Sequence, residues 1–255
     1  MTNEKSFFRN LSKPVDLTKG SPWKVLILYG APIMLSYFRQ QIYVLTDAII
    51  CGQTLTAGQV AGVNDTFPLT FIFLQFAFGC TSGFSVITAK RVGLKDEQAV
   101  RRSFAAQIYL TVAVSIVLTV LSIIFLPWLL SVINVTPTNK EVYDAAYYYC
   151  FVIFLGIITQ MGYNFVCGIL RAYGDSLTPL VFLVISTAIN VALDVFFLAV
   201  LKSGPAGAAA ATVITQFLSM PDKNKTNLAK TPLFPRFIPT PLKGSPSVDY
   251  SHGEY

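Results

Sequence analysis

The chain has 255 residues, of which 53% are hydrophobic and only 13% are charged, and its formal net charge at pH 7 is +6. A soluble globular domain carries roughly 25% charged residues, so this composition excludes an ordinary soluble protein. The apolar residues fall into runs of roughly 20, the length of helix that crosses a hydrocarbon layer about 30 Å thick. Because lipid leaves the edges of an open sheet without hydrogen bonds, we predict an all-α, polytopic membrane protein.

Six apolar segments are predicted to span the membrane as one helical bundle over residues 23–220. Residues 1–22 form a polar arm before the bundle. Residues 221–255 are rich in proline and polar residues without a helical or strand period, so we expect a disordered tail. The sixth segment has only about 15 residues, which is short for a span. The six segments cover residues 24–51, 61–89, 105–130, 142–170, 178–201 and 206 to about 220.

The cationic residues of the loops predict the orientation of this bundle. All but one of the 19 Lys and Arg residues lie between or beyond the apolar segments. Nucleic-acid binding needs such residues clustered on one folded face and is not expected. The arm, the loop after the second segment and the tail are rich in Lys and Arg, whereas the opposite loops offer only Lys140 and Lys202. Cationic loops stay in the cytoplasm, so we predict a multi-pass protein of the cell membrane with a cytoplasmic amino terminus.

Side chains suited to catalysis or metal binding are scarce in the sequence. The four cysteines lie in or beside apolar segments without a CxxC pair, and we interpret them as small buried apolar residues. The single histidine, His252, lies in the predicted tail. Because the sequence contains no catalytic cluster, we expect neither an enzyme nor a cofactor.

Two acidic residues lie well inside apolar segments. Asp47 belongs to LTDAIICG in the first segment, and Asp194 belongs to NVALDVFFLAV in the fifth. A carboxylate at membrane depth costs on the order of several kcal/mol, so it normally faces a protein interior and marks an ion or substrate path. Such a residue can also serve only to hold neighbouring helices together through hydrogen bonds.

The rise of a helix places two further polar residues at a similar depth. Asp47 lies roughly 6 Å, Asp194 roughly 10 Å and Thr212 roughly 9 Å from the outer end of its predicted helix. Asn190 precedes Asp194 by four residues, so both project from one helical face. We expect these four side chains to share one layer, where their oxygen atoms would bind a small cation such as Na⁺ or equally a proton.

Two other residues of the first segment stand out. Arg39 is the one basic residue inside a predicted helix, and it lies more than two turns from Asp47, so a salt bridge within the helix is not expected. It could line a cavity or pair with another helix. Pro32 removes a backbone donor, which predicts either a static kink or a hinge. Glycines inside the segments are predicted to permit close helix contacts, namely Gly79, Gly83, Gly156, Gly162 and Gly168.

Three stretches of this chain resemble one family of transporters. The opening of bacterial members of the multidrug and toxic compound extrusion (MATE) family is similar to DLTKGSPWKVLILYGAPIMLSYFRQQIYVLTDAIICGQTL. The second cytoplasmic-side segment of the family is similar to TSGFSVITAKRVGLKDEQAVRRS. Its region from the fourth to the sixth helix resembles GILRAYGDSLTPL followed by NVALDVFFLAVLKSGPAGAAAATVITQ. The resemblance covers residues 16–218.

This resemblance implies twelve helices in two six-helix bundles related by a pseudo-two-fold axis, of which this chain supplies the amino-terminal one. It also implies alternating access, driven by a proton or Na⁺ gradient, with export of organic cations and other xenobiotics. In the family, the cation site of the amino-terminal lobe uses acidic and polar residues of helices one, five and six. The residues that match those positions are Asp47, Asn190, Asp194 and Thr212.

The predicted tail stands where the family has its second bundle, so other interpretations stay open. The chain could be a transport-inactive truncated fragment. It could also be a half-transporter that needs a second lobe or chain, because the substrate cavity of the family lies between the two lobes. A flippase for lipid-linked sugars from the same superfamily ranks lower, because only Arg39 would line a cationic cavity. The sequence reveals neither the substrate nor the coupling ion.

Overall fold

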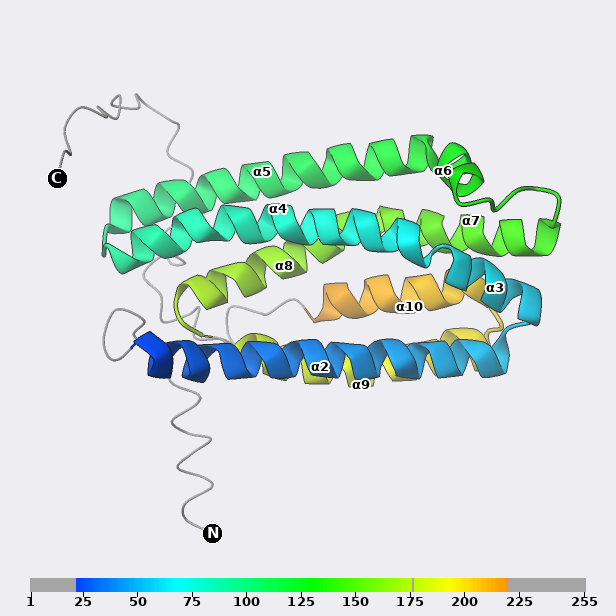
Figure 1. Cartoon of the computed structure of the whole chain (residues 1–255), viewed down its shortest axis with the longest axis horizontal. Coiled ribbons are helices and arrows are strands. Elements are labelled where there is room, and N and C mark those ends of the chain that lie inside the picture. Colours follow the sequence, from blue (N-terminus) through cyan, green and yellow to red (C-terminus); the bar gives the residue numbers. More distant parts are fainter. Residues whose placement is uncertain (1–21, 176, 220–255) are drawn as a thin grey trace, which may run out of the picture.

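The computed structural model describes residues 22–175 and 177–219, which form helices joined by short turns (Figure 1). These residues contain no strand, which confirms the predicted all-α architecture. The predicted tail and all but Pro22 of the predicted arm lie outside the described residues. In chain order the helices are α2 (Pro22–Thr54), α3 (Ala57–Asp65), α4 (Phe67–Gly93), α5 (Glu97–Ile124), α6 (Leu126–Val132), α7 (Lys140–Leu155), α8 (Ile157–Ala172), α9 (Leu177–Asp194), the π-helix η1 (Val195–Val200) and α10 (Gly204–Leu218).

Four of the six predicted segments are each divided into two helices, a detail that was not predicted from the sequence. Thr66 separates α3 from α4, Phe125 separates α5 from α6, and a proline occupies the first turn of each following helix. Proline favours such a start, because the amide that it lacks is unbonded in the first turn anyway. α7 and α8 meet at Gly156 with a bend of 44°. The fifth segment changes from α-helix to π-helix after Asp194.

Length and composition identify the segments that can cross a membrane among the described residues. Three helices qualify, namely α4, α5 and the continuous stretch Thr178–Val200, and the bent pair of α7 and α8 makes a fourth if it counts as one span. α2 has 33 residues but carries Arg39, Gln40 and Gln41 near its middle, and α10 has 15 residues. Three or four of the predicted spans therefore meet this criterion, and the fold is that of a polytopic helical membrane protein.

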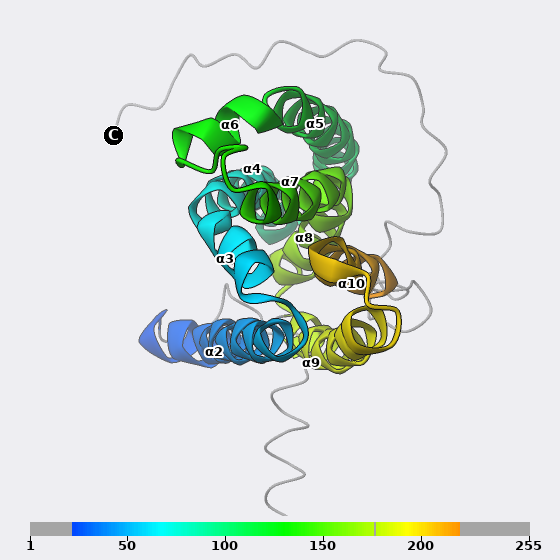
Figure 2. The same ribbon diagram turned by 90° about the vertical axis from the view of Figure 1, so that its right-hand side faces the viewer.

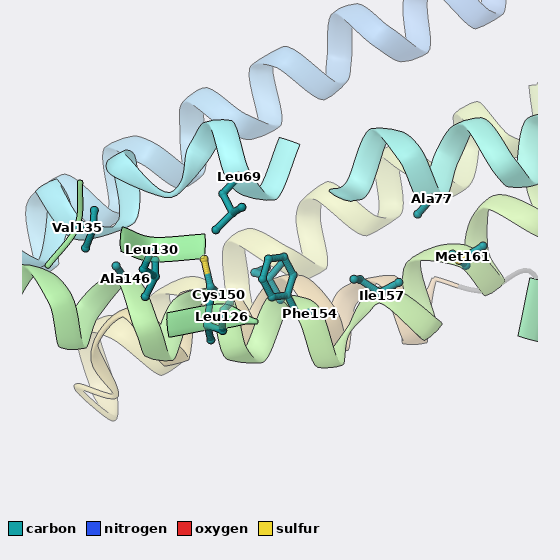
Figure 3. Close-up of a cluster of buried hydrophobic side chains, with 12 residues drawn as sticks. Leu69, Ala77, Leu126, Leu130, Val135, Ala146, Cys150, Phe154, Ile157 and Met161 are labelled. Atoms are coloured by element: carbon teal, nitrogen blue, oxygen red, sulfur yellow. The ribbon is translucent and has the colours of Figure 1, made fainter. Parts of the chain in front are cut away.

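The main apolar core lies between α4, α6, α7 and α8 (Figure 3). Phe154 of α7 is fully buried there, and its ring centroid lies 4.9 Å from that of Phe73 on α4. Large apolar side chains also cover the outer faces of the bundle, where Met34, Ile72 and Ile124 are between 64% and 74% exposed. Water would disfavour so many exposed apolar groups, whereas lipid accepts them.

A second group of helices completes the bundle beside this core. α2 and α9 lie side by side at one edge, and α10 packs between α9 and the pair of α7 and α8 (Figure 2). α10 is held against the bend at Gly156, where an added Cβ atom would lie 2.3 Å from Cγ2 of Val213. This side of the bundle brings together the helices that carry all four residues of the predicted cation site.

Helix α3 is fixed against α7 by polar and steric contacts. Thr56 caps α3, accepting a hydrogen bond from the amide of Gln59, and its hydroxyl also donates to the carboxylate of Glu141 at the start of α7. One turn further on, a Cβ atom at Gly62 would lie 2.5 Å from the carbonyl oxygen of Val142. Only glycine therefore fits this contact. By contrast, Gly79 and Gly83, which were candidates for close contacts, have nothing within 4 Å of an added Cβ.

We expect Gly62→Ala to destabilise the protein although alanine favours helix formation. The new methyl group would meet a backbone carbonyl and the Cβ atom of Ala145 at 2.9 Å, and neither can swing aside. Overpacking of this kind costs about 1–3 kcal/mol. Gly79→Ala is the matched control, because it adds the same methyl group in open space and gains about 1 kcal/mol of helix propensity. Melting curves of both variants in one detergent test the prediction, which an unchanged Gly62→Ala protein would contradict.

Candidate cation-binding site

The four predicted site residues come from three helices that pack on one another. Asp47 lies on α2, Asn190 and Asp194 lie on α9, and Thr212 lies on α10. The contacts between α2 and α9, between α9 and α10, and between η1 and both α2 and α10 hold this group together. The site therefore depends on packing between segments far apart in the sequence.

The helix ends place these residues at a common depth, with one correction to the prediction. α2 continues to Thr54 rather than ending near Cys51, so Asp47 lies seven residues, or roughly 10 Å, from its end. Asp194 lies six residues, or roughly 9 Å, before the end of η1. Thr212 lies eight residues, or roughly 12 Å, after the start of α10. Asp47 thus lies deeper than predicted and closer to the level of the other two.

The carboxyl groups of Asp47 and Asp194 interact directly across the contact between α2 and α9. Asp194 is fully buried and Asp47 is partly buried. The thiol of Cys51, one turn along α2 from Asp47, lies 4.0 Å from the Oδ1 atom of Asp47. Two neighbouring carboxylates in an apolar surrounding repel each other and have lost their hydration, so a proton or a cation between them would stabilise the pair.

Buried polar atoms at this pair make no hydrogen bond with any described residue outside the pair. Both carboxylate oxygens of Asp194 are without such a bond, and so are the amide nitrogen and oxygen of Asn190, whose side chain is 1% exposed. Buried polar groups in folded proteins are nearly always bonded. Four atoms on successive turns of α9 therefore lack the contacts that a bound ion or water molecule would supply. Thr212, which is partly buried, has an interaction of its own within the protein.

A small apolar group, which we call the end cluster, covers the site toward the helix ends. It consists of Cys51, Leu198 and Ala208, all at most 6% exposed and packed on one another. Cys51 lies four residues beyond Asp47, Leu198 four residues beyond Asp194, and Ala208 four residues before Thr212 in the antiparallel helix α10. The end cluster therefore forms a layer about one helical turn from the layer of the site.

The π-helix begins directly after Asp194 and was not predicted. Its wider turn is seen in the hydrogen bond from the amide of Leu201 to the carbonyl oxygen of Phe196, five residues earlier, at 2.9 Å. π-Helical turns are rare and are often found at functional sites. The sequence VFFLAV gives no local signal for this π-helical turn. The turn forms the last part of the fifth segment, in contact with α10.

The structure leaves two of the predicted roles untested. α2 runs through Pro32 and Arg39 without interruption, but the side chains of both residues lie outside the described part of the structure. A cavity-lining role for Arg39 and a hinge at Pro32 stay predictions. Sequence reasoning also treated Cys51 only as a buried apolar residue, although its spacing of four residues from Asp47 signals that both share one face of α2.

Comparison with known proteins identifies a family that this chain matches. The MatE family model matches residues 32–196. Two probable multidrug resistance proteins of Bacillus subtilis (strain 168) are similar. YpnP is 32% identical over 206 residues, which are 80% of this chain and 45% of the relative. YoeA is 31% identical over 202 residues, which are 78% of this chain and 43% of the relative.

The likeness extends to a solved structure. The crystal structure of MATE in the straight conformation matches with a TM-score of 0.72 and 26% identity, over 81% of this chain and 45% of that chain. The chain therefore spans about half the length of the proteins that it matches. The residues that the family model matches include Asp47 and Asp194.

Proposed function

Because the chain belongs to the MatE family, we propose that it is the cation-binding lobe of a cation-coupled antiporter that exports organic cations and other xenobiotics. The family and its named relatives support multidrug transport, and the chain is a membrane protein. The coupling ion, a proton or Na⁺, binds at Asp47 and Asp194, with Asn190 and Thr212 as further oxygen ligands. The distribution of Lys and Arg supports a place in the cell membrane with a cytoplasmic amino terminus.

One observation carries this proposal. Asp47 and Asp194 face each other inside the bundle, and the oxygens of Asp194 and the side-chain amide of Asn190 make no other hydrogen bonds among the described residues. A purely structural pair would use its hydrogen-bonding groups to join the helices. Unbonded oxygens next to a second carboxyl group instead favour a site for a positive charge.

Coupling follows from the repulsion between the two carboxyl groups. Without a bound cation, the pair favours any arrangement that moves α2 away from α9. A bound proton or Na⁺ removes the repulsion and favours the packed arrangement, which the structure has. A ligand shifts a conformational equilibrium only by its differential affinity for the two states, and here that difference comes from the distance between α2 and α9.

A second candidate function is that of a half-transporter, which needs another chain for transport. The chain spans 45% and 43% of the lengths of the two relatives from Bacillus subtilis. In this case the lobe binds its cation alone, but drug export requires a partner that completes the substrate cavity.

Cation binding can be tested on the purified chain in lipid nanodiscs. We expect Na⁺, or a lower pH, to raise the melting temperature, because a ligand at a hundredfold excess over its Kd stabilises the folded state by about 2.7 kcal/mol. Asp47→Asn should remove this response. The matched control is Asp65→Asn, which changes an exposed carboxylate at the end of α3. Equal responses of the wild type and Asp47→Asn to both ions would refute the proposed site.

Drug export needs a separate measurement in cells. We expect retention of ethidium to fall in cells that produce this chain together with the carboxyl-terminal half of YpnP. If the chain alone gives the same fall, it transports without a partner. If neither combination changes retention while the cation response is intact, the lobe binds its cation but the proposal of drug export is wrong.

A further inference from the structure

Two buried hydroxyl groups continue from the site along α10, in the direction away from the end cluster. Thr215 is 4% exposed and Ser219, just past the last turn, is 3% exposed. Their spacing of three and seven residues from Thr212 places all three on one face of the helix. Neither hydroxyl oxygen has a hydrogen-bond partner in the described structure. We call Thr212, Thr215 and Ser219 the hydroxyl column.

Most other buried hydroxyl groups among the described residues behave differently, with Thr111 of α5 as an exception. In an apolar surrounding, Ser and Thr commonly donate to the carbonyl oxygen of the preceding turn of their own helix. Thr70, Thr81 and Thr187 do so, at distances of 2.9 to 3.1 Å. Thr215 and Ser219 instead keep their hydroxyl groups available, although their burial is similar to that of Thr70 and Thr81. Such groups normally bond to buried water or to a ligand.

The surroundings of the carboxyl pair therefore differ on its two sides. On the side of the end cluster it meets apolar side chains, which offer no oxygen ligand and only the weakly polar thiol of Cys51. In the other direction the hydroxyl column follows, with rises of roughly 4.5 Å from Thr212 to Thr215 and 6 Å from Thr215 to Ser219. One water molecule can bridge hydroxyl groups at such separations.

We propose that the hydroxyl column is the path by which the coupling cation enters and leaves the carboxyl pair in this conformation, while the end cluster closes the opposite side. This inference rests on the proposed function. The hydroxyl oxygens, with bridging water, replace part of the hydration shell of Na⁺ or relay a proton in steps shorter than the full 10 Å or so between Thr212 and Ser219. Leu198 stands on the alternative route, because it lies about one turn beyond Asp194 and is packed within the end cluster.

The test separates the speed of cation exchange from the strength of cation binding. The chain in nanodiscs is subjected to a jump in pH or in Na⁺ concentration, and the infrared bands of the aspartic carboxyl groups report when the ion arrives. We expect Thr215→Val to slow this response about tenfold, the effect of removing one hydrogen-bond partner from a barrier. The cation concentration at half-saturation should change less than twofold, because Thr215 is not a ligand of the bound ion.

Three controls make the outcome decisive. Thr215→Ser keeps the hydroxyl group and should restore the rate. Thr70→Val removes a buried hydroxyl group that bonds within α4, and should leave the rate unchanged. Leu198→Ala should accelerate exchange by opening the closed side. If Thr215→Val and Ser219→Ala both exchange the cation as fast as the wild type, the proposed path is wrong. If the wild type shows no response to either ion, or if Asp194→Asn shows the same response as the wild type, the proposed function itself is wrong.

Discussion

Replacing Asp194 by Asn should make the cation-free protein more stable while it abolishes the response to Na⁺ and pH. Asp194 is fully buried beside Asp47, and neither of its oxygens is hydrogen-bonded within the described structure. In Na⁺-free buffer above neutral pH, the wild type has two options. Either the carboxyl pair stays protonated although few protons are available in solution, or the protein buries two negative charges that repel each other. Asparagine has the same shape without the charge, so we expect a gain of about 1–3 kcal/mol from removing a buried charge and its repulsion with Asp47.

The sign of this effect depends on the conditions, and this makes the prediction specific. The gain should grow as the pH rises, because only the wild type has to hold a proton at this position. It should shrink or reverse in saturating Na⁺, because only the wild type gains from binding. Melting temperatures over a range of pH, with Na⁺ or with a large organic cation, measure both trends. A variant that loses stability under all conditions would indicate that Asp194 serves as a structural hydrogen-bonding residue.

Gly156→Ala should displace α10, and Val213→Ala should reverse much of that damage. The new methyl group would lie 2.3 Å from Cγ2 of Val213 and 3.1 Å from its Cγ1 atom, so the two helices must separate or distort. Overpacking of a closely packed contact costs about 1–3 kcal/mol. Because Thr212 is the neighbour of Val213, the cation response should weaken together with the stability.

A double-mutant cycle measures this coupling directly. Val213→Ala removes both clashing methyl groups, so the double variant should be more stable than Gly156→Ala, with an interaction energy of about 0.5–3 kcal/mol. Gly83→Ala, in a helix position with nothing within 4 Å, is the matched control and should not be destabilised. Additive effects of the two substitutions would show that the bend tolerates a larger residue and that α10 is positioned by other contacts.

The sequence predicts the helices well and their interruptions poorly. Apolar runs of membrane length reveal where helices lie, because burial in lipid demands them over the whole run. The runs continue through Thr66 and Phe125, so composition alone does not show that a new helix begins there. Pro68 and Pro127 carry the missing signal. The bend at Gly156 depends on Val213, which is distant in the sequence, so no local pattern could predict it.

The candidate site illustrates the same limit. The depth of Asp47 and Asp194 follows from helix rise, and the spacing of Asn190 places it on the same face as Asp194. That α2 packs against α9, which lets the two carboxyl groups interact, is a result of tertiary structure. A role for Thr215 was not predicted, because a hydroxyl group inside a helix normally bonds to the backbone of its own helix. Only the structure shows that this hydroxyl group does not.

The interruptions at Thr66 and Gly156 also divide the bundle into two tiers. α3 is fastened to α7 through Thr56, Glu141 and Gly62, whereas α4 packs on α8 and α5. Each tier is thus joined laterally by helix contacts, and two of the crossings are interrupted between the tiers, whereas α2 and α5 run unbroken along the bundle. A tilt of α7 against α8 at Gly156 therefore bends the chain where a break already exists, and α10, which leans on Gly156, would follow the movement together with Thr212.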